Sequence, residues 1–338
     1  MDIGVIGAGS WGTSLAILLA NKGLRVHLWV RREELLQKMM EAGENAEYLP
    51  GIKLPGEIQF TADLPQVVRG KRVIVLSVPS HALGEMVKNV QEDLEEEAIV
   101  VNTAKGLTED THQRLSQVIL ENLPALDPGK LAVLSGPNHA EEVSRFFPAA
   151  TVVASTNQET AEIIQDLFMT RYFRVYTNPD VVGVELGGAL KNIIAIGAGV
   201  CEGLNFGDNT KAALLTRGLV EITRLGLSLG AKSRTFSGLT GVGDLFVTCT
   251  STHSRNRYVG LRLGQGETLA EITASMKMVA EGIKTTRAAA ALSRVHQVEM
   301  PITREMYGIL FENTEPWQAV ENLMRREKTK EIEELAFD

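Results

Sequence analysis

Residues 3–12 read IGVIGAGSWG, an apolar run that leads directly into a Gly-x-Gly-x-x-Gly turn, and the apolar stretch 15–19 follows it. In the dinucleotide-binding fingerprint the first glycine makes the tight turn, the second lets the backbone approach a pyrophosphate, and the third lets the helix pack closely on the strand. The N-terminus of that helix faces the phosphates. A glycine turn without a ligand is the alternative, but the flanking strand and helix favour a dinucleotide site at Gly7, Gly9 and Gly12.

The second predicted strand, residues 25–30, is not followed at once by the acidic residue that binds the ribose 2′-hydroxyl in NAD-specific sites. Arg31 and Arg32 come next, and Glu33 and Glu34 stand only beyond them. A carboxylate would repel a 2′-phosphate, whereas a guanidinium can bind it with two hydrogen bonds. Solvated loop charges are the alternative. We expect a site that accepts NADP(H), with Arg31 and Arg32 as its readers of the 2′-phosphate.

The bulk composition is that of a soluble protein of two domains. The chain has 338 residues, of which 44% are hydrophobic and 22% charged. Its net charge of −8 argues against general binding to nucleic acid or an anionic membrane, so an anionic substrate must be met by a local basic cluster. Cys201 and Cys249 are too few for a disulfide framework, and the histidines form no metal-ligand spacing. We expect no metal, no stable membrane insertion and a cytoplasmic location.

Short β-branched runs alternate with helical stretches through the first half of the chain. Most of these runs are continuously apolar, as expected for a parallel sheet that is covered on both faces. The pattern predicts strands at 3–6, 25–30, 73–78, 99–102, 131–134 and 151–155, with helices between them, for example at 81–94 and 111–123. We therefore expect an α/β domain with a doubly wound, Rossmann-like sheet over residues 1–178.

The pattern changes at Asn178-Pro179-Asp180, a turn signal with a helix-capping Asp. Long helical patterns follow at 181–204, 209–229, 282–295, 303–312 and 316–326, and the charged stretch 325–335 reads as a solvated helix. We expect an all-α substrate domain over residues 179–338, which is large enough for a core of its own.

Two lysines stand where they can carry chemistry. Lys105 follows the fourth predicted strand, and ligands of doubly wound folds bind beyond the carboxyl ends of strands. Lys191 lies in a helical stretch of small and apolar residues, with Gly187 and Gly188 one turn before it on the same face. We expect the glycines to clear space over Lys191, and burial to lower its pKa towards neutrality. An exposed Lys105 and a snorkelling Lys191 are the alternatives.

The segment 241–257, GVGDLFVTCTSTHSRNR, gathers polar side chains. Asp244 can balance a cationic lysine, and Thr248 adds a hydroxyl. Ser254, Arg255 and Asn256 offer hydroxyl, guanidinium and amide donors, a set that suits a phosphate dianion. A helix cap is the alternative for Ser254.

These motifs match a known family in order and spacing. The chain resembles the bacterial-type NAD(P)-dependent glycerol-3-phosphate dehydrogenases through GAGSWGT, SVPSHAL, NTAKGL, SGPNHAEE, GGALKNIIAIGAG, GVGDLFVTCTSTHSRN and VAEGIKT. The resemblance implies interconversion of dihydroxyacetone phosphate and sn-glycerol 3-phosphate for phospholipid synthesis, with NADP(H) or NAD(H) as the cofactor. It also suggests a homodimer formed through the helical domain.

The resemblance assigns roles to matching residues. The implied cofactor contacts are Ser10, Trp11, Arg31, Arg32, Lys105, Ala140, Arg255, Val279 and Glu281. The implied substrate contacts are Lys105, Gly136, Asn138, Lys191, Asp244, Ser254, Arg255 and Asn256. Position 138 departs from the family, which usually has a small hydroxyl residue there.

The expected mechanism needs no metal, because lysines supply the positive charge. Lys191 donates the proton to the developing oxyanion, with Lys105, Asp244 and Thr248 beside it, while Arg255 and Asn256 anchor the phosphate. Two alternatives remain open: a related dehydrogenase acting on a β-hydroxyacid, and a cofactor-binding sensor without turnover.

Overall fold

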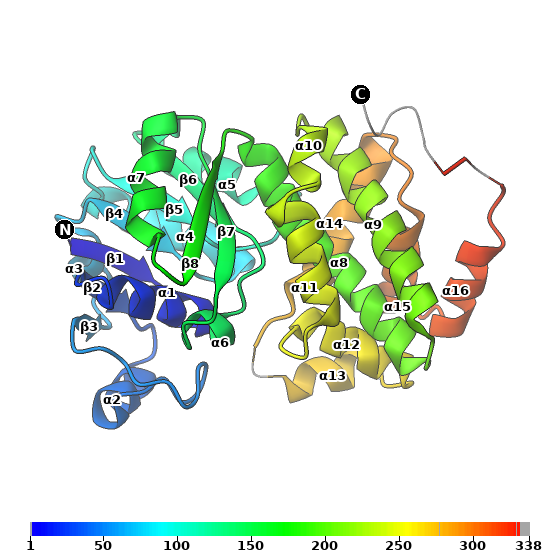
Figure 1. Ribbon diagram of the computed structural model, residues 1–338, viewed down its shortest axis with the longest axis horizontal. Coiled ribbons are helices and arrows are strands. Elements are labelled where there is room, and N and C mark those ends of the chain that lie inside the picture. Colours follow the sequence, from blue (N-terminus) through cyan, green and yellow to red (C-terminus); the bar gives the residue numbers. More distant parts are fainter. Residues whose placement is uncertain (1, 277, 329, 332–338) are drawn as a thin grey trace. The chain divides into compact units, whose positions relative to one another are not determined.

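The computed structural model describes residues 2–276, 278–328, 330 and 331. The chain divides into two compact units (Figure 1). The first comprises residues 1–104 and 115–181, and the second comprises residues 105–114 and 182–338. The sequence boundary at 178/179 therefore lies three residues before the last change of unit, and the excursion of residues 105–114 into the helical unit was not predicted.

The first unit is built on one eight-stranded sheet with the order β3-β2-β1-β4-β5-β6-β7-β8. All neighbouring strands are parallel except β6 and β7, which are antiparallel. The strands are β1 (Asp2–Ile6), β2 (Arg25–Trp29), β3 (Ile58–Thr61), β4 (Val73–Leu76), β5 (Ile99–Asn102), β6 (Leu131–Ser135), β7 (Ala149–Ala154) and β8 (Phe173–Asn178). The doubly wound sheet expected from the sequence is confirmed.

Helices cover both faces of this sheet, because consecutive strand residues point to opposite sides. Ile3 and Val5 of β1 pack in one cluster with α1 and α7, whereas Ile6 packs with α3, α4 and α5 in another. The helices are α1 (Ser10–Ala20), α2 (Glu33–Ala42), α3 (Leu64–Val68), α4 (Ser80–Val90), α5 (Leu115–Asn122), α6 (Ala140–Val143) and α7 (Gln158–Phe168), with short 3-10 turns at Gln91–Asp93 and Pro128–Lys130.

The sequence analysis missed β3 and β8, which form the two edges of the sheet. In β8, Phe173 and Val175 are buried while Arg174 and Tyr176 are exposed. Such alternating, half-polar strands differ from the continuous apolar runs that predicted the central strands.

The second unit is helical, as predicted. The five predicted stretches correspond to α8 (Val181–Gly203), α9 (Asp208–Ser228), α14 (Glu281–Val295), α15 (Pro301–Phe311) and α16 (Pro316–Met324). Shorter helices were missed: α10 (Ser233–Phe236), a π-helical turn (Leu239–Gly243), α11 (Asp244–Thr250), α12 (Arg255–Gly264) and α13 (Leu269–Ser275). The helix expected over 325–335 is wrong for residues 325–328, 330 and 331, which are not helical; residues 329 and 332–335 lie outside the described residues.

Helix α8 is the centre of this unit. Among the described residues, α8 is the one helix that is long and apolar enough to cross a membrane. However, 89% of its most apolar 18-residue stretch is buried within the protein. Burial on all sides is typical of a core helix in a soluble protein.

Residues 105–114 form a closed loop on the helical unit, although they lie between β5 and α5 in sequence. Leu107 is buried in the helical core and pairs with Arg114 in an antiparallel bridge. The Arg114 guanidinium lies 2.8 Å from the Glu185 carboxylate of α8, and Arg287 of α14 lies 2.5 Å from Glu109. Lys105 is therefore carried by the helical unit.

Candidate functional site

The glycine turn between β1 and α1 brings helix and strand close together and leaves open space at Gly9. Gly7 has a φ of +114°, and a Cβ there would lie 2.5 Å from the Ser77 carbonyl oxygen. A Cβ on Gly12 would lie 1.9 Å from the Gly7 carbonyl oxygen, so this glycine permits the close approach of helix and strand. A Cβ on Gly9 would meet nothing within 4 Å. Helix α1 begins at Ser10 without a side-chain cap, so its first N–H groups suit a phosphate.

Asn45 braces this turn and was missed by the sequence analysis. Its buried side-chain amide donates to the Ala8 carbonyl oxygen at 2.9 Å and to Thr13 Oγ1 at 2.8 Å. Trp11 packs partly buried against the same core, with its ring centroid 6.5 Å from that of Phe173.

Arg31 and Arg32 lie exposed just beyond the carboxyl end of β2, where the sequence predicted them. Arg32 is the N-cap of α2, and its Nη2 donates to Glu47 Oε1 at 2.5 Å and to the Tyr48 hydroxyl at 3.2 Å. The hydrogen bond to Glu47 raises the pKa of Arg32.

Gly136, Asn138 and Ala140 follow the carboxyl end of β6, in the first unit. The Asn138 amide donates to Thr151 Oγ1 at 2.9 Å. Ala140 opens α6, and its carbonyl oxygen accepts from Ser14 Oγ of α1 at 3.2 Å. This contact places Ala140 beside the helix that follows the glycine turn.

The second unit brings two lysines to one carboxylate. Lys191 Nζ donates to Asp244 Oδ1 and, at 2.7 Å, to Thr248 Oγ1. Lys105 Nζ donates to Asp244 Oδ2 at 2.8 Å. Asp244 and Lys191 are buried, whereas the Lys105 side chain is 21% exposed. The sequence named all four residues, and the structure joins them in one hydrogen-bonded cluster.

Burial and charge together tune this cluster. Burial lowers the pKa of Lys191 to about 7; Asp244 acts to raise it, and Lys105 lowers it further. Burial acts to raise the pKa of Asp244, but Lys105 and Lys191 outweigh this, so the pKa is lowered and the carboxylate stays charged. Lys191 is therefore suited to exchange a proton near neutral pH.

Close helix packing sets the position of Asp244. A Cβ on Gly187 would lie 2.9 Å from the Thr240 carbonyl oxygen, so the glycine lets α8 contact the π-helical turn that precedes Asp244. The sequence analysis expected Gly187 to leave open space over Lys191. The Thr240 backbone fills the space beside Gly187 instead. Thr248 lies one turn after Asp244 on the same face of α11.

The Ser-Arg-Asn trio starts α12. Ser254 is its N-cap and accepts from the Arg257 N–H at 3.2 Å, the structural role that the sequence left as an alternative. The Asn256 amide donates to Asn192 Oδ1 and accepts from the Gly282 N–H, both at 2.9 Å. Asn192, next to Lys191 in α8, was missed by the sequence analysis.

Arg255 joins this trio to the start of α14. Its Nη1 donates to the Val279 carbonyl oxygen at 3.0 Å. Val279 is exposed and Glu281 is the first residue of α14, both in the helical unit. Residue 277 lies outside the described residues.

Both thiols are buried, and burial raises the pKa of Cys201 to about 11 and of Cys249 to about 12. Within residues 2–276, 278–328, 330 and 331, no three His, Cys, Asp or Glu side chains gather as a metal site.

Known proteins match this chain along almost its full length. The family model described as NAD-dependent glycerol-3-phosphate dehydrogenase N-terminus matches residues 2–161, and the corresponding C-terminus model matches residues 180–321. A glycerol-3-phosphate dehydrogenase [NAD(P)+] from Moorella thermoacetica is 54% identical over 332 residues, 98% of each chain. One from Pelotomaculum thermopropionicum is 54% identical over 335 residues, covering 99% of this chain and 96% of the relative. The crystal structure of glycerol-3-phosphate dehydrogenase from Coxiella burnetii superposes with a TM-score of 0.92 at 38% identity, covering 96% of this chain and 99% of that chain.

Proposed function

Since the chain belongs to the family of NAD(P)-dependent glycerol-3-phosphate dehydrogenases, we propose that its first unit holds the dinucleotide and its second supplies the proton and the phosphate contacts. The chain is an oxidoreductase that interconverts sn-glycerol 3-phosphate and dihydroxyacetone phosphate with NAD(P)(H).

The observation that carries the proposal is the hydrogen-bonded cluster of Lys191, Asp244, Thr248 and Lys105. When bound, the nicotinamide supplies hydride to the C2 carbonyl carbon of the substrate or takes it back. Negative charge then grows on the carbonyl oxygen, and Lys191 as an ammonium donates a proton to it. In the oxidative direction the neutral amine of Lys191 accepts the proton.

The neighbours of Lys191 fix the position of its amino group and influence its pKa. Asp244 and Thr248 orient its Nζ through hydrogen bonds, and Asp244 keeps its pKa from falling further. Lys105 donates a hydrogen bond to the other carboxylate oxygen of Asp244. The positive charge of Lys105, added to that of Lys191, stabilises the oxyanion or orients a terminal hydroxyl of the substrate.

Arg255 is the proposed main anchor of the substrate phosphate, because a guanidinium binds a phosphate with two hydrogen bonds. Ser254 and Asn256 already bond to the backbone N–H groups of Arg257 and Gly282. We therefore assign Ser254 first to capping α12, and Asn256 first to joining α12 with α8 and the start of α14. Contact with the phosphate is the second role of both.

In the first unit the proposed cofactor contacts are the glycine turn with Ser10 and Trp11, the two arginines after β2, and Ala140. The open space at Gly9 and the uncapped start of α1 support a pyrophosphate there. Gly136 and Asn138 are proposed for the substrate. Lys105, Arg255, Val279 and Glu281 complete the cofactor contacts from the helical unit.

The test is the loss of absorbance at 340 nm when the purified protein is mixed with NADPH and dihydroxyacetone phosphate. We expect turnover with dihydroxyacetone phosphate and little with dihydroxyacetone. Turnover only with a β-oxo acid would point to a β-hydroxyacid dehydrogenase, and binding without turnover would point to a sensor. We also propose a cytoplasmic homodimer that supplies glycerol phosphate for phospholipid synthesis.

A further inference from the structure

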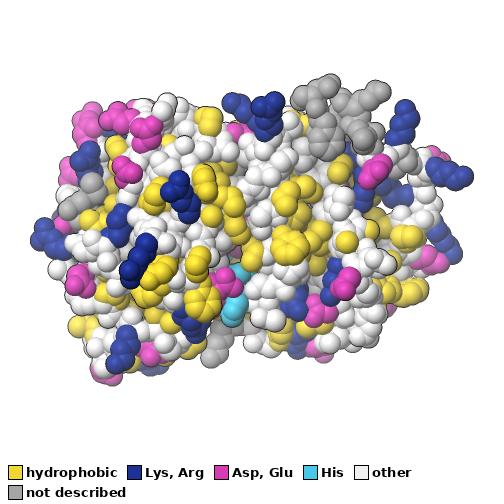
Figure 2. All heavy atoms as spheres, in the orientation of Figure 1, with side chains coloured by type: hydrophobic (Ala, Val, Ile, Leu, Met, Phe, Trp, Pro, Cys, Tyr) yellow, Lys and Arg dark blue, Asp and Glu magenta, His cyan; other side chains and the backbone are white. Residues whose placement is uncertain are grey.

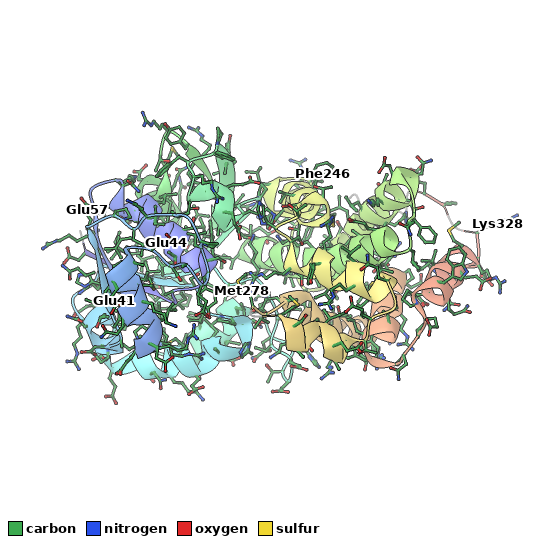
Figure 3. The ribbon with its side chains drawn as sticks, turned by 90° about the horizontal axis from the view of Figure 1, so that it is seen from below. Glu41, Glu44, Glu57, Phe246, Met278 and Lys328 are labelled. Carbon is green, nitrogen blue, oxygen red and sulfur yellow. The ribbon has the colours of Figure 1, made fainter. Side chains whose placement is uncertain are left out.

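Residues 44–53, called here the 44–53 loop, form a fixed structure between α2 and β3. An antiparallel bridge between Glu44 and Lys53 closes the loop, and the Gly51 N–H donates to Glu44 Oε1 at 2.7 Å. Figure 3 labels Glu44 directly after α2, whose last turn carries Glu41. Leu49 is 1% exposed and packs in the hydrophobic cluster that contains Ile3 and Val5 of β1.

This loop reaches both halves of the proposed cofactor site. Asn45, fully buried, holds the glycine turn through Ala8 and Thr13. Two and three residues later, Glu47 and Tyr48 contact Arg32. Glu47 is therefore placed by a fixed backbone, and its carboxylate is held beside Arg32.

The Arg32–Glu47 ion pair lies at the surface, where another anion can readily replace Glu47 as the partner of Arg32. The Arg32 side chain is 45% exposed and that of Glu47 is 29% exposed. Ion pairs of this kind are weak because water and salt screen them. A phosphate dianion is a stronger partner for a guanidinium than one carboxylate is.

We propose that Glu47 sets the preference between NADPH and NADH by competing with the 2′-phosphate for Arg32. The inference rests on the proposed role of Arg32 as a reader of that phosphate. NADPH must displace Glu47 from Arg32 and place its phosphate near a carboxylate. NADH carries only a neutral 2′-hydroxyl at this position, and that group does not compete with a carboxylate for the guanidinium. Glu47 thus reduces the advantage of NADPH without abolishing it, which suits a site that uses both cofactors.

The test measures dissociation constants, so that it does not depend on turnover. Calorimetry with Glu47→Gln should show NADPH binding about two- to fivefold tighter, the size expected when a weak competing ion pair is removed. The affinity for NADH should stay unchanged. Adenosine 2′,5′-bisphosphate should gain like NADPH, whereas AMP should not. The gain should shrink as salt is raised.

Glu34→Gln is the matched control. Glu34 lies in the first turn of α2 and acts on Arg32 through charge at a distance, with no hydrogen bond between them. The Glu34→Gln substitution removes the same charge as Glu47→Gln. If it tightened NADPH binding to a comparable degree, the overall negative charge near Arg32, and not the Glu47 contact, would set the preference. That result overturns the inference.

The Arg32→Ala background separates the inference from its premise. If Arg32→Ala weakens NADPH and Glu47→Gln has no effect in that background, the competition is supported. If Arg32→Ala weakens NADPH but Glu47→Gln alone leaves the NADPH-to-NADH ratio unchanged or lowers it, the inference fails and the role of Arg32 stands. If Arg32→Ala changes neither cofactor, the premise itself fails.

Discussion

Asp244 divides its two carboxylate oxygens between two lysines, Lys191 on Oδ1 and Lys105 on Oδ2. A buried charge is tolerated where it is paired and hydrogen-bonded, and here one carboxylate serves two ammonium groups. When both lysines are protonated, the cluster carries a net charge of plus one. This local excess suits an anionic substrate on a chain whose overall charge is −8.

Lys191→Ala should lower kcat by at least ~10²-fold, because the proton donor is lost. Asp244 keeps Lys105 as its partner, so the fold should survive. Stopped-flow or steady-state assays at 340 nm measure the loss, and cofactor affinity should be nearly unchanged. Lys211→Ala on α9 is the control and should retain kcat; wild-type turnover in Lys191→Ala would remove this residue from the mechanism.

The pH dependence should have opposite signs in the two directions. Lys191 has a pKa of about 7, so reduction, which needs the ammonium, should slow as the pH rises through that value. Oxidation, which needs the amine, should speed up over the same range. Asp244→Asn removes a charge that raises the Lys191 pKa, so the residual activity should show both midpoints shifted to lower pH. Profiles that shift to higher pH would contradict this assignment.

At the scale of elements, a buried side chain from one helix holds the start of another. Helix α15 begins with Pro301, and the buried Glu221 carboxylate of α9 accepts from the next two N–H groups, those of Ile302 at 2.5 Å and Thr303 at 3.0 Å. The Thr303 hydroxyl donates to it as well. Burial raises the pKa of Glu221 to about 7, although these hydrogen bonds act to lower it.

Glu221→Gln should destabilise the protein by about 1–3 kcal/mol, because an amide group would face backbone donors. The sign of the pH effect follows from the raised pKa. Between pH 4.5 and about 7 the folded state binds more protons than the unfolded state, so this residue's contribution to stability falls as the pH rises. Thermal unfolding at several pH values should show that dependence reduced in the variant. Exposed Glu41→Gln should leave it unchanged, and an unaltered profile in Glu221→Gln would contradict the prediction.

Gly187→Ala tests the contact that places Asp244. The added Cβ would lie 2.9 Å from the Thr240 backbone and push the turn before α11, which should lower kcat about ten- to a hundredfold. Gly197→Ala is the matched control in the same helix. Its Cβ would meet only flexible side-chain atoms of Leu214 and Met306, at 3.3 and 3.4 Å, so kcat should be retained. Equal effects of the two variants would show that helix propensity, and not the Thr240 contact, is responsible.

The sequence could predict those parts of the site that a local pattern marks. Gly7, Gly9 and Gly12 act within one turn, and Arg31 and Arg32 follow directly from the end of β2. Asn45 and Glu221 could not be found this way. Asn45 bonds Thr13, 32 positions away, and Glu221 bonds residues 81 and 82 positions away. The short helices around Asp244 also escaped prediction, because stretches of four to ten residues carry too few turns to show a helical period.

At the scale of the whole molecule, the chain is acidic, with a net charge of −8. The face drawn in Figure 2 shows basic, acidic and apolar side chains interspersed over each unit. Basic groups concentrate locally instead, as at Lys105 and Lys191. The two-part division was predictable from the change of pattern near residue 178. The passage of residues 105–114 into the helical unit was not, because Leu107 is a single apolar residue in a polar loop.

The proposed homodimer makes a prediction at this scale. Light scattering after gel filtration should give a mass twice the 36.8 kDa of one chain. A monomer that retains full turnover over the range of assay concentrations would overturn this proposal.

The excursion of residues 105–114 has a consequence for anyone who exchanges parts between related enzymes. The chain changes unit after residues 104, 114 and 181, so no single crossover separates the two. A chimera joined only near residue 181 would import a foreign Lys105 together with the donor's sheet, and would seat a foreign Leu107 in the recipient's helical core. Such hybrids should recover activity when residues 105–114 come from the same parent as the helices. This ten-residue segment should therefore be exchanged together with the helical unit, although both of its ends are joined to the first unit.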